Sequence, residues 1–282
     1  MRATMLDDYL PEASPNASSV TGAGLLFAVL GPLEVRRSSG EQVRIDQRKK
    51  RILLLTLLLH AGQWVSVDGM RLALWQDAPP RSAGGNIKTY LSELRHTLRP
   101  PLDTSGAGGN GPGRIESRPG EYRLVVASGE IDAKRFESAA EQGRAAVRAG
   151  SPERAAGFFE GALALWRGDA FDELPAEIAG AEVLRLEEAR WAVCEDLIDA
   201  RLALGEYDRV LPTLRALTVE HPTRERLWAQ LILALEHTGR RAEALAEYQT
   251  VYRRLVTELG IEPGVELRRA HQHVLNPDSW VT

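Results

Sequence analysis

The chain has 282 residues, of which 44% are hydrophobic and 26% charged, a composition typical of a globular protein with one large domain or two ordinary ones. Its single cysteine, Cys194, excludes a disulfide framework and any cysteine-based zinc site. The nearest candidate for a membrane span, Leu25–Leu30, is too short, and the first residues lack a basic segment before an apolar core. We therefore expect a cytoplasmic protein, free to associate with the nucleoid, with no membrane partner.

The net charge of −4 is unevenly distributed along the chain. Residues 1–24 carry a net charge of −2, residues 25–127 carry +6, and the remainder carries −8. The overall acidity argues against nucleic-acid binding, but the distribution does not. A basic module joined to an acidic one indicates a division of labour in which the basic part can approach a polyphosphate.

The first 24 residues are rich in Ala, Ser, Pro and Asp and show little periodicity, which predicts a disordered tail. Apolar residues then run from Leu25 to Val35 and alternate over Val43–Ile45, on either side of a turn signal at Ser38–Gly40. This pattern predicts a small antiparallel sheet of two or three short strands.

A leucine-dense core helix is predicted from Gln47 to Ala61, capped by Asp46 and closed by Gly62. Four cations in its first turn oppose the helix macrodipole: Arg48, Lys49, Lys50 and Arg51. The cluster is either simply solvated, or relieved by an external anion such as DNA phosphate or an acidic protein patch. The sequence supports these two interpretations about equally.

A short helix over Asp68–Trp75 and a stiff loop over Gln76–Pro80 lead into an amphipathic helix. Its apolar stripe consists of Ile87, Leu91, Leu94 and Leu98, with Ser82 as a possible cap and Pro100–Pro101 as its end. The opposite face carries hydrogen-bond donors and cations, with Glu93 as its only acid: Lys88, Thr89, Ser92, Arg95, His96 and Arg99. Such a face suits a DNA major groove, although an ordinary surface helix is the simpler interpretation of this segment alone.

A hairpin is predicted after a glycine-rich stretch at residues 103–113. Gly106–Gly111 matches the dinucleotide motif G-x-G-x-x-G but lacks the strand before it and the helix after it, so we expect a flexible loop. Strands over Arg114–Arg118 and Tyr122–Val126 flank Pro119-Gly120. Sheet, helices and hairpin together predict a winged helix-turn-helix at residues 25–127. Its wing arginines, Arg114, Arg118 and Arg123, would suit phosphate or the minor groove.

From Ile131 onward the pattern is helical, with segments near 132–149, 152–166, 175–204, 207–220, 222–238, 240–258 and 263–275. Gly205 and Gly239 lie 34 residues apart and precede apolar residues at similar offsets, as in tetratricopeptide (TPR) repeats. An insertion at residues 167–190 makes the array irregular. We expect an all-α, TPR-like domain at residues 131–276 that binds protein or dimerises, with Tyr248 in its core. The whole chain would then be mainly α with a small β component.

Blocks of sequence in both halves carry a family resemblance. In the N-terminal half they are Phe27–Val35, Arg51–Leu55, Leu74–Pro80, Asn86–Arg95 and Glu121–Leu124; in the C-terminal half they are Ala162–Gly168, His221–Leu227, Gly239–Gln249 and Leu259–Gly264. In this order, they resemble the Streptomyces antibiotic regulatory protein (SARP) family and its bacterial transcriptional activation domain. The resemblance covers nearly everything after residue 24.

The resemblance implies an OmpR-type winged helix followed by a TPR-like activation domain. It implies a transcriptional activator that binds direct repeats beside promoters of antibiotic or other secondary-metabolite biosynthetic genes, as a homodimer on double-stranded DNA. It also implies recruitment of RNA polymerase through sigma region 4, the beta flap and the alpha C-terminal domain. By position, Asn86–Leu98 is the recognition helix and Ile115–Leu124 the wing. Gly84-Gly85 departs from helix-favouring residues, which predicts a late or mobile helix start.

These arguments select the candidate site residues. Base-edge contacts are expected from Thr89, Tyr90, Ser92, Glu93 and His96. Phosphate or groove-edge contacts are expected from Lys88, Arg95, Arg99, Arg114, Arg118 and Arg123. Candidate polymerase contacts are Trp75, Gln76 and Asp77 in the loop and the cluster of Arg48, Lys49, Lys50 and Arg51.

Enzyme motifs such as G-x-S-x-G and H-E-x-x-H do not occur in the sequence. His271 and His273 fall on different faces of a helix, which is poor metal geometry. We therefore expect no catalytic residue, no cofactor and no metal. The better rival is a TPR-type scaffold or adaptor without DNA binding, which would lack a salt-dependent affinity for random duplex DNA.

Overall fold

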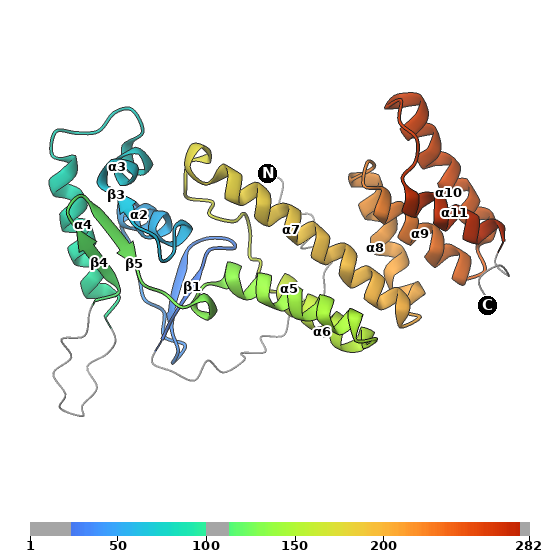
Figure 1. Ribbon diagram of the computed structural model, residues 1–282, viewed down its shortest axis with the longest axis horizontal. Coiled ribbons are helices and arrows are strands. Elements are labelled where there is room, and N and C mark those ends of the chain that lie inside the picture. The colour runs from blue at the N-terminus through green and yellow to red at the C-terminus, as the bar shows by residue number, and fades with distance from the viewer. Residues whose placement is uncertain (1–23, 100–112, 277–282) are drawn as a thin grey trace. The chain divides into compact units, whose positions relative to one another are not determined.

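The computed structural model describes residues 24–99 and 113–276, drawn as ribbon in Figure 1. The expected tail, the Pro100–Pro101 helix end and almost all of the glycine-rich stretch lie outside the described residues. The chain forms two compact units. One contains the described residues up to Ala139 together with Gly161–Arg190, and the other contains Ala140–Glu160 and the described residues from Trp191 onward. Their boundaries, at residues 139–140, 160–161 and 190–191, fall within helices of the C-terminal half, and the division of the sequence near residues 127–131 stays a prediction.

The first unit begins with a two-stranded antiparallel sheet of β1 (Leu25–Ala28) and β2 (Glu34–Arg37). Of the two or three strands expected here, two form, and near Val43 a single bridge joins Arg36 to Gln42. The connecting turn needs glycine at Gly31, where φ is +136° and a Cβ would lie 2.9 Å from the Arg167 carbonyl carbon. This turn therefore packs against the segment that contains Arg167 and Gly168.

Three helices and a three-stranded sheet complete the winged helix-turn-helix. The helices are α2 (Arg48–Leu59), α3 (Val67–Trp75) and α4 (Ala83–Thr97). The strands β3 (Val65–Ser66), β4 (Ile115–Arg118) and β5 (Glu121–Leu124) pair antiparallel in the order β3-β5-β4, which confirms the predicted hairpin. Ser66 caps α3 by accepting a hydrogen bond from the Gly69 N–H at 3.0 Å.

Helix α2 is a core element, as its leucine-dense sequence indicates. Residues 52–58 are all buried, because the helix is covered on every side. The predicted Asp46 cap is wrong. Gln47 occupies the N-cap position and no side chain caps the helix, so Asp46 lies one residue too early to reach the free N–H groups.

The helices of the C-terminal half follow the predicted segments closely. After a single 3₁₀ turn, Ser128–Glu130, they are α5 (Asp132–Arg148), α6 (Pro152–Leu163), α7 (Ala176–Ala203), α8 (Tyr207–Glu220), α9 (Glu225–His237), α10 (Arg241–Arg253) and α11 (Val265–Leu275). A π turn, Arg254–Glu258, extends α10. No helix in the described part of the chain is both long enough and apolar enough to cross a membrane.

Asp132, the first residue of α5, ties this helix to β1. Its buried carboxylate accepts hydrogen bonds from the backbone N–H groups of Val29 at 2.8 Å, Leu30 at 3.1 Å and Ala133 at 2.8 Å. Burial raises the pKa of Asp132, and the bonds from Val29 and Leu30 oppose that rise. The carboxylate thereby satisfies backbone donors that follow the end of β1 and would otherwise be buried without acceptors.

Helix α9 is the centre of the second unit and packs against α8, α10 and α11. Its Leu227, Ile232 and Leu235 are fully buried. Tyr248 on α10 was expected in this core, and that expectation is wrong. Its ring is half-buried and stacks on His271 of α11, with 3.6 Å between ring centroids, because this face of α10 meets the last helix at the margin of the array.

Candidate nucleic-acid interface

The packing of α4 fixes which of its faces is free. Its stripe of Ile87, Leu91, Leu94 and Leu98 is fully buried, as the sequence predicts. The predicted late start is wrong, since the helix begins at Ala83, which is only 2% exposed. Gly84 and Gly85 are helical because burial of the whole apolar face of α4, from Ala83 to Leu98, outweighs their unfavourable propensity. Ser82 stands at the N-cap position but caps no backbone group; its hydroxyl accepts from the Asn86 side chain at 3.2 Å.

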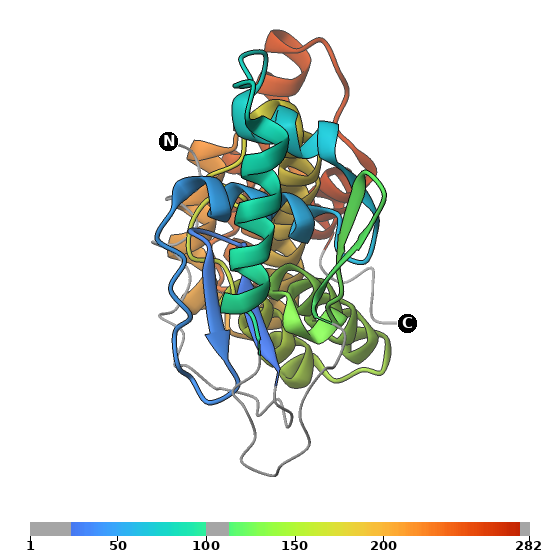
Figure 2. The ribbon, with the colours of Figure 1, turned by 90° about the vertical axis from the view of Figure 1, so that its left-hand side faces the viewer.

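The opposite face of α4 is open. In Figure 2 this helix lies in front of α2 and α3, with the β4–β5 hairpin beside it. The exposed residues on it are Lys88, Thr89, Ser92, Glu93 and His96, and Tyr90 is half-buried; Arg99, also exposed, lies two residues past the end of the helix. The Thr89 hydroxyl donates to the Gly85 carbonyl at 3.2 Å, which leaves its oxygen lone pairs outward as acceptors. One face of α4 therefore presents donors, acceptors and cations together.

Two of the α4 residues predicted to contact DNA have partners within the first unit. Glu93 forms an ion pair with Lys50 of α2. Arg95 donates from Nε to the Ile115 carbonyl at 2.8 Å, and its guanidinium lies 5.7 Å from the centre of the Tyr122 ring. Arg95 therefore joins α4 to the hairpin, and its free N–H groups, rather than the whole guanidinium, remain for an outside partner.

Each predicted wing arginine is paired with a glutamate that the sequence patterns did not single out. Arg114 binds Glu130 through two bonds of 2.8 Å, and these side chains are 22% and 13% exposed. Arg123 binds Glu116. Arg118 binds Glu121 in the most open pair, with side chains 49% and 31% exposed. Arg118 is thus the wing arginine that an external phosphate can most easily take over.

Trp64 holds two of these arginines in place. The guanidinium carbons of Arg118 and Arg123 lie 4.5 Å and 4.6 Å from the centres of the Trp64 rings. A cation over an indole face is worth roughly 0.5–1 kcal/mol at an exposed site. Trp64 was not predicted as part of the site. It immediately precedes β3, and the pairing of β3 with β5 brings it against hairpin residues that lie about 55 positions later in the sequence.

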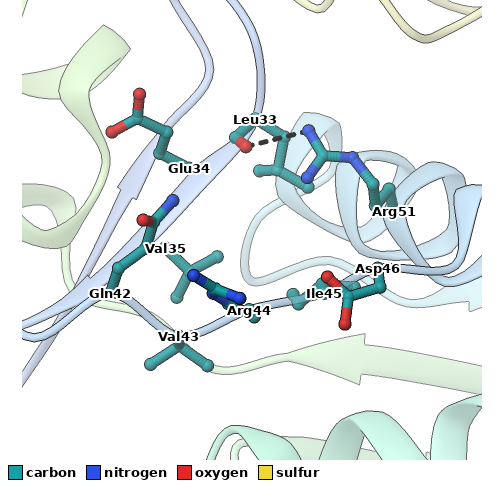
Figure 3. A pocket seen from close by; sticks show the side chains of 9 residues that line it. All are labelled: Leu33, Glu34, Val35, Gln42, Val43, Arg44, Ile45, Asp46 and Arg51. Carbon is teal, nitrogen blue, oxygen red and sulfur yellow. Dashed lines mark hydrogen bonds between the residues drawn. The ribbon is translucent and has the colours of Figure 1, made fainter.

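The cationic first turn of α2 does not act as one cluster. Arg48 and Lys49 are exposed, and the Lys49 ammonium lies 4.9 Å from the Trp75 ring centre. Lys50 binds Glu93, as described above. Arg51 turns the other way, donating to the Leu33 carbonyl at 2.9 Å (Figure 3) and from Nε to Glu173 at 2.7 Å. It borders a hollow of about 300 Å³ lined by β2 and residues 42–46.

The Arg51–Glu173 pair predicts a pH-dependent stability. The hydrogen bonds from Arg51 lower the pKa of Glu173 below its usual value of 4.5. A lowered carboxyl pKa stabilises the fold above the unfolded pKa, and this contribution is lost as the pH falls through the folded value. We expect Glu173→Gln to reduce the free energy of unfolding by about 1 kcal/mol at pH 7, less than a fully buried pair because water screens it.

Urea unfolding at pH 7 and at pH 3 tests this expectation, with the difference between variant and wild type shrinking at pH 3. The exposed Glu177→Gln serves as a control and should cost about 0.5 kcal/mol or less. Equal losses for Glu173→Gln at both pH values would contradict the assignment.

The loop between α3 and α4 contains a strained residue. Gln76 has φ +50° and ψ −123°, a backbone conformation that residues other than glycine rarely adopt. Its N–H nevertheless donates to the Leu72 carbonyl at 2.8 Å, which ends α3. Gln76 and Asp77 are exposed, whereas Trp75 is half-buried under Lys49. The structure therefore presents the polar residues of the loop to solvent and keeps part of Trp75 against α2.

Comparison with known proteins identifies the family of this chain. Residues 131–275, just over half of the chain, match the family model of the bacterial transcriptional activator domain. The chain is 38% identical over 256 residues to the regulatory protein DnrI of Streptomyces peucetius, a match that covers 90% of this chain and 93% of DnrI. The chain belongs to the SARP family. This family consists of transcriptional regulators, so the expectation that the chain is not an enzyme is confirmed.

Other SARP relatives are longer. The regulatory protein AfsR of Streptomyces coelicolor is 35% identical, over 94% of this chain but 25% of AfsR. The solved structure of Mycobacterium tuberculosis EmbR, in complex with a low-affinity phosphopeptide, superposes with a TM-score of 0.77 at 33% identity, covering 90% of this chain and 65% of that one. The shared fold is a winged helix-turn-helix followed by a helical domain, which confirms the predicted fold class.

Proposed function

We propose that this SARP regulator binds double-stranded DNA by placing α4 in the major groove. The observation that carries the proposal is the division of α4 into a fully buried apolar stripe and an exposed face of donors, acceptors and cations. A major groove admits one helix and distinguishes base pairs through such groups. Membership of a family of transcriptional regulators supports the same conclusion.

The contacts divide by chemistry. Thr89, Ser92 and His96 are short or compact polar side chains in the middle of the exposed face, so we assign them to base edges, with Tyr90 at the margin. Lys88 and Arg99 are longer and exposed, so we assign them to phosphates. Arg95 joins α4 to the wing through the Ile115 carbonyl, and its remaining N–H groups can donate to DNA. Glu93 can contact a base only if its ion pair with Lys50 is broken.

Among the wing arginines, we assign the DNA contact to Arg118. Its pair with Glu121 is the most exposed of those formed by the wing arginines. The Arg118 guanidinium lies over the Trp64 ring, which orients it. Arg114 instead stabilises the base of the hairpin through Glu130, and Arg123 bridges the two strands through Glu116.

Paired substitutions test these assignments. Arg99→Ala should weaken binding to all duplex sequences alike and lower the slope of log affinity against log salt by about one unit, because one phosphate contact is lost. Arg114→Ala is the matched control: it should lower thermal stability through the unpaired, largely buried Glu130 and leave the salt slope unchanged. The phosphate assignment fails if Arg99→Ala keeps the wild-type slope.

We further propose that two protomers sit head to tail on direct repeats beside promoters of biosynthetic genes, with recognition helices about one helical turn apart, roughly 34–36 Å. From there the protein recruits RNA polymerase through sigma region 4, the beta flap or the alpha C-terminal domain. The contact candidates that the structure leaves exposed are Gln76, Asp77, Arg48 and Lys49, whereas Arg51 is occupied by Glu173.

In vitro transcription distinguishes the loop from the α2 cations. The double variant Gln76→Ala/Asp77→Ala should protect its operator as wild type does and lose most of the activation. Gln76→Gly is the control for loop shape. Glycine tolerates the positive φ, so this variant should keep the loop conformation while lacking only the Gln76 side chain. Full activation by the double variant would move the polymerase contact to Arg48 and Lys49 or to the helical domain.

A further inference from the structure

Two imidazoles and a carboxylate meet at one end of the second unit. Glu236 and His237 end α9, and His273 lies in the last turn of α11, which packs against α9 (Figure 1). Glu236 Oε2 is 3.7 Å from His237 Nδ1 and 3.5 Å from His273 Nε2. One ligand atom from each residue lies within 4.8 Å of the others.

The distances do not suit hydrogen bonds. Glu236 Oε2 is buried and has no hydrogen-bond partner, and the two imidazoles compensate its charge as ion-pair partners only when they are protonated. Two ligands of one tetrahedral zinc ion, each at about 2.0–2.1 Å from the metal, are roughly 3.3–3.5 Å apart. The separations from Glu236 to both imidazoles match that spacing to within a few tenths of an ångström.

The surroundings favour a cation at this place. The ligands come from the last turns of two helices, where the backbone carbonyls carry partial negative charge. The His237 ring is stacked on Tyr207 of α8, with 4.6 Å between centroids and planes 10° apart, so its orientation is fixed. Arg241 opposes a cation in part, but its guanidinium is directed to the Leu275 carbonyl at 2.8 Å.

We propose that Glu236, His237 and His273 form a binding site for a divalent transition-metal ion, and that this ion is Zn²⁺. Nitrogen and carboxylate ligands in this number suit Zn²⁺, whereas Mg²⁺ and Ca²⁺ prefer oxygen alone. Water would fill the fourth position. The ion would fasten α11 to α9 and stabilise the end of the helical domain, independently of whether the winged helix binds DNA.

Sequence analysis could not find this group. In the sequence His271 and His273 are neighbours, but in the structure they lie apart: His271 stacks on Tyr248, while His273 faces Glu236. The three ligands are brought together only by the packing of α11 on α9. The expectation of no metal site was drawn from His271 and His273, without Glu236 and His237.

Titration of the full chain, without a histidine tag, tests the proposal with Zn²⁺ and with Co²⁺ as a spectroscopic probe. Wild type should bind one Zn²⁺, rise in melting temperature, and give the intense visible absorption of four-coordinate Co²⁺. His273→Ala should weaken Zn²⁺ binding by about 100-fold or more, beyond the losses typical of outer-shell changes. His271→Ala, two residues away on the same helix, should bind Zn²⁺ as wild type does.

Circular dichroism establishes that each variant is folded, and Glu236→Gln replaces His273→Ala if the latter is not. Glu236→Gln keeps the size of the side chain and removes the charge, so it should also lose Zn²⁺ binding. The proposal is overturned if wild type fails to bind Zn²⁺ at micromolar concentration, or if His271→Ala reduces binding as much as the ligand variants do.

Discussion

Replacing Asp132 by alanine is expected to lower the free energy of unfolding by about 3 kcal/mol. The carboxylate accepts three backbone N–H groups, and its loss leaves those of Val29 and Leu30 buried without acceptors, at roughly 1–3 kcal/mol each. Loss of the whole carboxylate also removes the hydrogen bonds that link the segment after β1 to α5. Chemical denaturation at pH 7 measures the effect.

Asp208→Ala is the matched control for Asp132. Asp208 also lies in the first turn of a helix, α8, but is exposed. Its removal should cost only the helix-dipole contribution, about 0.3–1 kcal/mol. Equal losses for the two variants would mean that Asp132 acts through the helix dipole and not through β1.

Trp166→Ala is expected to have a still larger effect, about 4 kcal/mol. Trp166 is 6% exposed and meets Phe136 edge-on, with 5.6 Å between ring centroids. The guanidinium carbon of the buried Arg190 lies 4.7 Å from its ring centre. Truncation would open a large cavity and remove the aromatic face beside a buried cation. Thermal and denaturant unfolding of the full chain measure the loss.

Trp166→Phe separates the ring from the indole N–H. Because the indole nitrogen has no hydrogen-bond partner in the structure, the phenyl ring should keep most of the packing and cost about 1–2 kcal/mol. If the phenylalanine variant is as unstable as the alanine variant, the shape of the indole matters more than its aromatic contact with Phe136 and Arg190.

Periodicity was sufficient for the elements that carry the proposed function. The spacing of Ile87, Leu91, Leu94 and Leu98 predicted the buried face of α4, and the exposed face followed from it. The helical segments after Ile131 were also predicted, because each has an apolar pattern bounded by glycine or proline. These features depend on local spacing, which the sequence contains directly.

The side-chain pairs were not predictable in the same way. Glu130, Glu116 and Glu121 neutralise wing arginines, and Glu173 binds Arg51 across about 120 positions of sequence. Such partners are chosen by tertiary packing, and the hairpin register decided those within the wing. The error over Tyr248 has the same origin, since the repeat offset gave its helical position but not which neighbour would cover it.

The prediction that Asp46 caps α2 was wrong for a local reason. Asp is a favoured cap, but the helix began at Arg48, so Gln47 took the cap position and the nearby acid had no role there. Helix starts are set by where the backbone leaves the extended region, which depends on the packing of α2 as a whole and not on one residue.

The central claim is that this SARP regulator binds DNA through α4 and the wing, and a salt titration of wild type on a random duplex tests it most directly. With Lys88, Arg99 and Arg118 on phosphates, log affinity should fall linearly with log salt, with a slope of roughly −3. Operator DNA should bind more tightly, with a similar slope for each bound protomer. A chain with no measurable affinity for either duplex at low salt, or an affinity that does not change with salt, would contradict the account and indicate a helical-repeat scaffold.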